Sequence, residues 1–92
     1  MKKEESTREV IISGIVSAAK WDEHAKVTGI KISATDEEEY LVDLDTMGRQ
    51  LFEHIRNLIK ATVIVKGTSG REKLITVKRY EVINRLYSTD LH

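Results

Sequence analysis

The sequence predicts a mostly β domain with a single helix, in the order β-β-β-α-β-β. One stretch, residues 45–61, carries apolar residues at the spacing of one helical face: Met47, Leu51, Ile55, Leu58 and Ile59. The segments on both sides instead carry β-branched residues and alternating apolar and polar positions, separated by acidic or glycine-containing turns. A chain of 92 residues has the length of one domain.

Residues 10–19 are predicted as a long first strand, followed by a loop at residues 20–25. Apolar residues fall on both parities, because Ile12 and Val16 share one and Ile11 and Ile15 share the other. We therefore expect the strand to be covered on both faces, or to bend so that its inward side changes. Gly14, in the middle of the strand, permits such a bend or a bulge.

The second and third strands are predicted at residues 26–35 and 39–45, joined by an acidic hairpin turn at residues 36–38. Strict alternation assigns one face of each strand to the core. The expected inward residues are Thr28, Ile30, Ile32 and Ala34 on the second strand, and Tyr40, Val42 and Leu44 on the third.

The helix predicted at residues 45–61 has two candidate N-caps, Asp45 and Thr46, whose side-chain oxygens can accept a hydrogen bond from the first turn. Gly48 costs roughly 1 kcal/mol of helix propensity relative to alanine. We therefore expect this helix to depend on coverage of its apolar face.

The remaining strands are predicted at residues 62–66 and 73–83, with a glycine-containing hairpin loop between them at residues 67–72. Residues 1–8 are expected to form a flexible N-terminal segment, because they are terminal and highly charged. The folded domain is therefore expected at residues 9–83, with a C-terminal tail at residues 84–92.

This order of elements resembles the OB-fold, in which a helix plugs one end of a five-stranded, partly open barrel. The resemblance covers residues 9–83 and rests on Gly14 in the long first strand, the position of the helix, and the strand end at Gly67. A ferredoxin-like fold would need a second helix. An SH3-like barrel would not need an amphipathic helix of three turns.

The charge of the chain is balanced overall but segregated along the sequence. Residues 1–46 hold 6 Lys and Arg against 11 Asp and Glu, whereas residues 47–92 hold 9 against 4. This composition excludes a generic polyanion binder and leaves room only for a local basic surface. The apolar run at residues 10–19 follows a segment without net positive charge and is too short to span a bilayer, so we expect a cytoplasmic protein without a membrane segment.

The sequence offers little support for catalysis. It has no cysteine, which excludes thiol chemistry and disulfides. The histidines His24, His54 and His92 do not pair at metal-ligand spacing. The acidic run at residues 36–39 lacks the EF-hand pattern, and residues 67–73 lack the P-loop pattern. We therefore expect no enzyme, no cofactor and no metal site.

The resemblance implies a ligand on the face of the second and third strands, between the first and last loops. Single-strand binding requires cations along the phosphates and exposed aromatic rings for the bases. The candidate ligand-binding residues are Lys20, Trp21, Lys26, Lys31, Lys66, Arg71 and Lys73. Trp21 has an alternative role as a cap on one end of the barrel, and the outward Glu39 and Asp43 would repel phosphate.

The expectation is a non-enzymatic small binding module that holds single-stranded nucleic acid weakly. The alternative is a protein–protein adaptor or a subunit of a larger assembly, because the two halves of opposite charge could dock on copies or partners.

Overall fold

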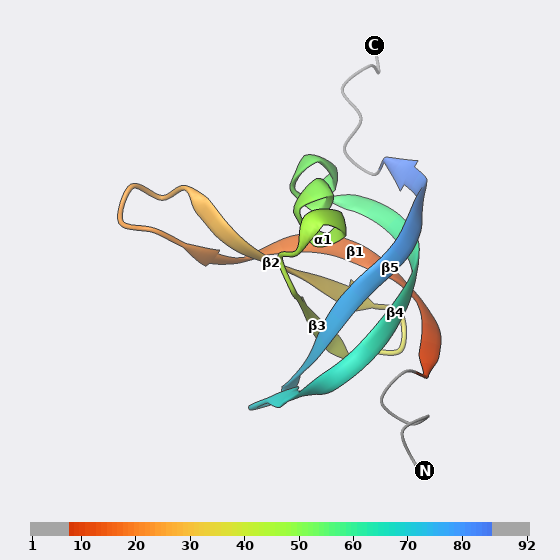
Figure 1. Ribbon diagram of the computed structural model, residues 1–92. Coiled ribbons are helices and arrows are strands. Elements are labelled where there is room, and N and C mark those ends of the chain that lie inside the picture. The colour runs from red at the N-terminus through yellow and green to blue at the C-terminus, as the bar shows by residue number, and fades with distance from the viewer. Residues whose placement is uncertain (1–7, 86–92) are drawn as a thin grey trace.

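The computed structural model describes residues 8–85, which form a closed five-stranded barrel with one short helix (Figure 1). The elements are β1 (Glu9–Trp21), β2 (Val27–Ala34), β3 (Glu39–Val42), α1 (Thr46–Gln50), the 3-10 helix η2 (Leu51–His54), β4 (Asn57–Ser69) and β5 (Glu72–Arg85). Neighbouring strands follow the order β1-β2-β3-β5-β4, antiparallel except for β3 and β5. The predicted element order is confirmed, but the expectation of a partly open sheet is wrong, because the sheet closes.

β1 pairs with two strands, β4 and β2. Its first half pairs with β4 and its second half with β2, and Gly14 faces Ala34 on one side and Ile59 on the other. A Cβ atom at Gly14 would collide with the carbonyl oxygen of Ser33, so only glycine allows β2 to approach this closely. The inward side does not change at this point, since Ile12 and Val16 are both buried while Ile11 is 62% exposed.

The core lies inside the barrel and is entirely apolar apart from the hydroxyl of one tyrosine. It consists of Ile12, Val16, Ile30, Ile32, Tyr40, Val42, Leu51, Ile59, Ala61, Val63, Ile75 and Val77. The predicted inward faces of β2 and β3 are therefore confirmed at four positions, and Ala34 and Leu44 pack partly against the core. Thr28 is the exception, because it is exposed on a part of β2 that extends beyond the barrel.

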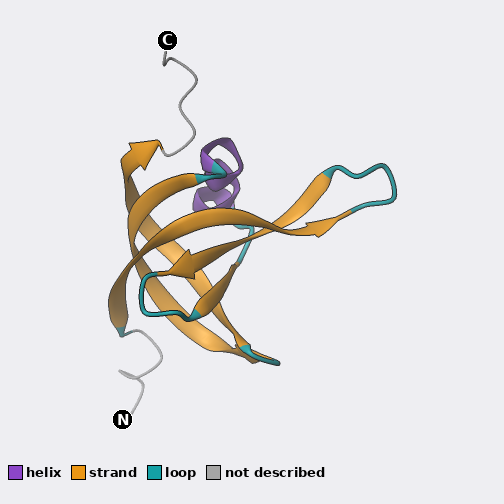
Figure 2. Ribbon diagram, turned by 180° about the vertical axis from the view of Figure 1, so that it is seen from behind, coloured by secondary structure: helices purple, strands orange, loops and turns teal. Residues whose placement is uncertain are grey.

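The helix is much shorter than predicted. α1 and η2 end at His54, at one end of the barrel (Figure 2), where Leu51 is fully buried and Met47, Phe52 and Ile55 pack against the core. Ile55 is already extended, with ψ 133°, and Arg56 takes a left-handed φ of 79°. The prediction of helix for residues 55–61 is wrong, because β4 begins at Asn57 and pairs there with β1 and β5.

The last two strands are longer than predicted and form a twisted ribbon. Register shifts interrupt the β4–β5 ladder between Leu58 and Ile59, between Thr62 and Val63, and between Val65 and Gly67. β5 continues through residues 84 and 85, which were expected in the tail, while the rest of that tail and residues 1–7 lie outside the described residues. Within residues 8–85 no helix has the length and apolarity needed to cross a membrane.

Candidate ligand-binding face

β1 and β2 extend beyond the barrel as a two-stranded ribbon, which we call the β1–β2 arm (residues 20–29; Figures 1 and 2). Its tip is organised by Asp22. One carboxylate oxygen of Asp22 accepts hydrogen bonds from the backbone N–H groups of His24 (2.8 Å) and Lys26 (2.9 Å), and the Asp22 N–H donates to the Lys26 carbonyl (2.9 Å). Ala25 closes the turn in a left-handed conformation, with φ 63°. The arm is therefore held in one shape although it projects into solvent.

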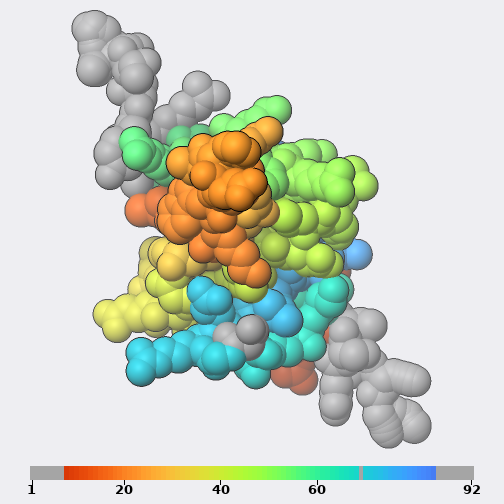
Figure 3. Space-filling view, turned by 90° about the vertical axis from the view of Figure 1, so that its left-hand side faces the viewer, coloured from red at the N-terminus to blue at the C-terminus, as the bar shows by residue number. Residues whose placement is uncertain are grey.

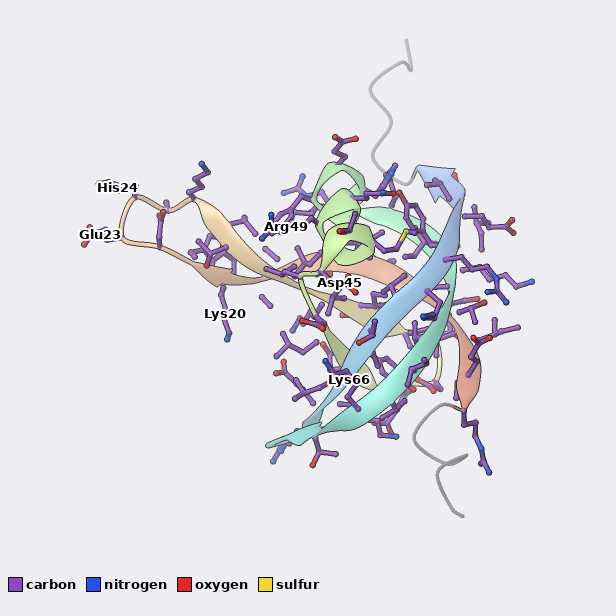
Figure 4. All side chains as sticks on the ribbon, in the orientation of Figure 1. Lys20, Glu23, His24, Asp45, Arg49 and Lys66 are labelled. Carbon is purple, nitrogen blue, oxygen red and sulfur yellow. The ribbon has the colours of Figure 1, made fainter. Side chains whose placement is uncertain are left out.

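The arm carries two of the candidate residues, Lys20 and Trp21, on β1. After two register shifts, Lys20 lies opposite Gly29 and Trp21 lies opposite Val27. The aliphatic stem of Lys20 covers Gly29, because a Cβ atom there would lie 3.2–3.3 Å from the stem carbons. Gly29 and Val27 are two positions apart on β2 and therefore share one face of the arm, so their partners Lys20 and Trp21, between which the register shifts, lie on that same face. The Lys20 side chain points to the side on which Lys66 lies (Figure 4).

The hairpin that joins β4 and β5 lies on the same side of the molecule as the arm (Figure 3). We call residues 66–73 the β4–β5 hairpin, and the outer surface of β2, β3 and β5 between it and the arm the ligand face. Three outward side chains follow one another across this face in register, since Lys31 faces Leu41 and Leu41 faces Leu74. The next residue in this row is Gly67 on β4.

A groove of about 380 Å³ lies in the ligand face. It is lined by Leu41, Val42, Asp43, Leu44, Lys66 and Leu74. Gly67 borders Leu74, and a Cβ atom at Gly67 would meet nothing within 4 Å, so the missing side chain leaves this side of the groove open. The apolar side chains come from β3, from the segment that leads to α1, and from β5.

The two lysines at the groove, Lys31 and Lys66, are neutralised by carboxylates. Lys31 Nζ lies 3.0 Å from Glu39 Oε1, and Lys66 Nζ lies 2.9 Å from Asp43 Oδ2. Lys73 lies outside the groove, because it pairs with Tyr40 on the inward face of the sheet; its Nζ lies 3.8 Å from Glu38 Oε1 and 5.9 Å from the centre of the Tyr40 ring. The centre of the ligand face is therefore apolar and nearly neutral.

The remaining predicted cations differ in that they have no carboxylate partner among the described residues. Lys20, Lys26 and Arg71 have no carboxylate within 4.0 Å among residues 8–85. Lys26 is part of the arm tip, and Arg71 lies in the turn of the β4–β5 hairpin. The structure thus places Lys31 and Lys66 at the groove, Lys20 and Arg71 at its margins, and Lys73 beside Tyr40, while Trp21, which is 58% exposed, lies next to Lys20 on the arm.

Sequence reasoning missed the groove itself. Leu41 alternates with Tyr40 and Val42 and so stood in the sequence as an outward residue, but a single outward leucine is ordinary on a protein surface and does not by itself mark a contact surface. Leu44 and Leu74 could not be placed beside it without the parallel pairing of β3 and β5.

A second, smaller hollow of about 190 Å³ lies on the outer face of β4 and β5, lined by Lys60, Thr62, Arg79, Tyr80 and Glu81. At the helix end of the barrel, the His54 ring meets Tyr80 edge-on, with 5.4 Å between the ring centres, and the Tyr80 hydroxyl donates to Gln50 Oε1 (3.1 Å).

Within the described part of the chain, no group of three His, Asp or Glu residues is arranged to hold a metal ion. Comparison of the chain with protein-family models, curated proteins and solved structures finds no match.

Proposed function

We propose that this chain is a non-enzymatic binding module with an OB-type barrel, and that its ligand is an extended polypeptide segment held on the ligand face. The strand order, the sharing of β1 between β2 and β4, and the helix between the third and fourth strands support the OB-type assignment. The ligand face lies where that fold type commonly binds its ligands, between the first and last hairpins.

The observation that carries the polypeptide assignment is the apolar groove among lysines that already have carboxylate partners. A nucleic-acid strand would place a phosphate on each nucleotide across a surface whose cations Lys31 and Lys66 are already paired with Glu39 and Asp43. The centre of the face therefore offers no net positive charge to these phosphates. An apolar side chain of a peptide, by contrast, gains roughly 25 cal/mol for each Å² of apolar surface that the groove removes from water.

A selection with random displayed heptapeptides tests this function, using the full chain as bait. We expect enriched peptides to share an apolar residue and to lose binding to Gly67→Trp, because the new ring enters the groove from its open side. The matched control is Thr68→Trp, in which the same ring points to the other face of β4. Enrichment of no sequence, or equal binding to both variants, would contradict the proposal.

Single-stranded nucleic acid is the second candidate, and the specific observation in its favour is the exposed Trp21 beside Lys20 and Lys26, neither of which has a carboxylate partner in residues 8–85. Trp21 is the single tryptophan of the chain, so its fluorescence reports on the arm alone. Titration with oligo-dT and oligo-U at low salt should quench this fluorescence in a saturable way if a base stacks on the ring. An unchanged signal at micromolar concentrations would remove this candidate.

A further inference from the structure

We propose that the polypeptide ligand carries an apolar residue flanked on both sides by carboxylates. This inference rests on the proposed function and adds the chemistry of the ligand to it. It follows from the way charge is distributed along the ligand face, which differs between its centre and its two ends.

The cations at the centre of the face already have carboxylate partners, so the centre has no net positive charge. Lys31 and Lys66 each have a carboxylate within 4.0 Å, and the groove beside them is lined by three leucines, Leu41, Leu44 and Leu74. A carboxylate of the ligand placed here would lie against Asp43, whose side chain lines the groove. The centre therefore accepts an apolar side chain and disfavours an acidic one.

The two ends of the face keep their positive charge. At the arm, Lys20 has no carboxylate partner among the described residues, and its stem is supported by Gly29, which directs the ammonium group toward the side of Lys66. At the hairpin, Arg71 is exposed and likewise lacks a carboxylate within 4.0 Å among residues 8–85. A ligand with carboxylates at both ends complements this pattern.

The length of the face sets the spacing in the ligand. From β2 to β4 the face spans three strand-to-strand steps, which is about 14 Å at the usual spacing. An extended chain rises about 3.3 Å per residue, so about four residues cross the face. An apolar pair in the middle of a hexapeptide would then lie over Leu41 and Leu74, with its acidic residues reaching toward Lys20 and Arg71.

Three fluorescein-labelled hexapeptides test this inference in anisotropy titrations with the full chain: Glu-Glu-Leu-Leu-Glu-Glu, Lys-Lys-Leu-Leu-Lys-Lys and Glu-Glu-Ser-Ser-Glu-Glu. We expect the first peptide to bind about tenfold tighter than the second, because exposed ion pairs replace exposed repulsions at both ends. The serine peptide should bind most weakly, and high salt should reduce the difference between the first two.

Lys20→Ala and Arg71→Ala should each weaken the binding of the acidic leucine peptide about threefold. The matched control is Lys60→Ala, which removes an exposed cation from the outer face of β4, outside the groove. Equal affinities for the acidic and basic leucine peptides, or no effect of either margin variant, would overturn the inference. If both leucine peptides then still lose binding to Gly67→Trp, the polypeptide function stands, whereas no binding by any peptide would overturn both.

Discussion

At Gly48 a residue with poor helix propensity stands inside the helix for a steric reason. A Cβ atom at this position would collide with the carbonyl oxygen of Asp43 and lie 3.1 Å from Cγ1 of Val42. The Gly48 N–H also donates to the cap residue, reaching Asp45 Oδ1 at 3.0 Å. The absence of a side chain thus lets α1 lie directly on the chain that leaves β3, which offsets the lost helix propensity.

We expect Gly48→Ala to lower the free energy of unfolding by about 2 kcal/mol, because the methyl group forces α1 away from a rigid backbone carbonyl. Urea denaturation measures this change. Gly67→Ala is the matched control, since a Cβ atom there meets nothing within 4 Å, and it should gain about 0.5 kcal/mol from lower chain entropy in the unfolded state. Equal stability of the Gly48→Ala variant and the natural chain would contradict the steric explanation.

Tyr40 gives the fold a dependence on alkaline pH. Its side chain is buried in the core and its hydroxyl donates to Asp36 Oδ2 at 3.3 Å. Burial, followed by the charges of Asp36 and Glu38, raises the pKa of Tyr40 above its ordinary value of 10.0. A raised folded-state pKa means that the folded state holds this proton more tightly, so stability is full below pH 10.0 and falls as pH rises through the folded pKa.

The Tyr40→Phe variant should lack this part of the loss of stability at alkaline pH, because it has no phenolic proton to release. Urea denaturation between pH 8 and pH 11 would show the natural chain losing stability above about pH 10 with a steeper slope than the variant. Parallel slopes in the two proteins would show that another group controls the alkaline limit.

At the scale of elements, the helix marks the boundary of what the sequence could predict. Asp45 was one of two candidate caps and is the cap in the structure, and the apolar face at Met47 and Leu51 does cover the barrel end. From Leu58 onward the sequence fits both a helical period and a strand period. Ile59 continues the apolar face of the helix, and it also begins a run of apolar residues at every second position, with Ala61 and Val63. Only the pairing of β4 with β1 and β5 decides between them, and that pairing depends on residues far away in the sequence.

The shortest strand of the barrel is β3, which closes it. β3 pairs with β5 only from Tyr40 to Val42, whereas β4 pairs with β5 along nearly its whole length. Just beyond β3, the Asp43 N–H donates to the Ile75 carbonyl at 2.8 Å. Because local opening starts where few neighbouring interactions must break together, the barrel should open first at this seam.

Hydrogen exchange followed by NMR tests this expectation. The backbone amides of residues 40–43 should exchange faster than those of residues 59–63, which lie between β1 and β5 in the buried middle of β4. The comparison needs conditions in which local opening, not global unfolding, limits exchange. Uniform protection of both groups would show that the barrel opens only as a whole.

For the whole molecule, the sequence predicted the element order and, through the resemblance to a known fold type, proposed a set of candidate cations. It could not predict which of these cations have carboxylate partners in the folded chain. The pairing of Lys66 with Asp43 joins residues 23 positions apart, and the face on which Trp21 lies depends on two register shifts in the arm. Strand bulges and long-range ion pairs leave no local pattern, because neither has a fixed spacing in the chain.

The turn at the tip of the β1–β2 arm also makes the molecule convenient to engineer. Asp22 and Lys26 close that turn by hydrogen bonds of their own, and the three residues between them lie outside the barrel and are exposed to solvent. Exposed loop tips of this kind tolerate insertions well. An epitope or a dye grafted between Asp22 and Lys26 would therefore sit at a fixed point beside the ligand face, where it could report occupancy without disturbing the core.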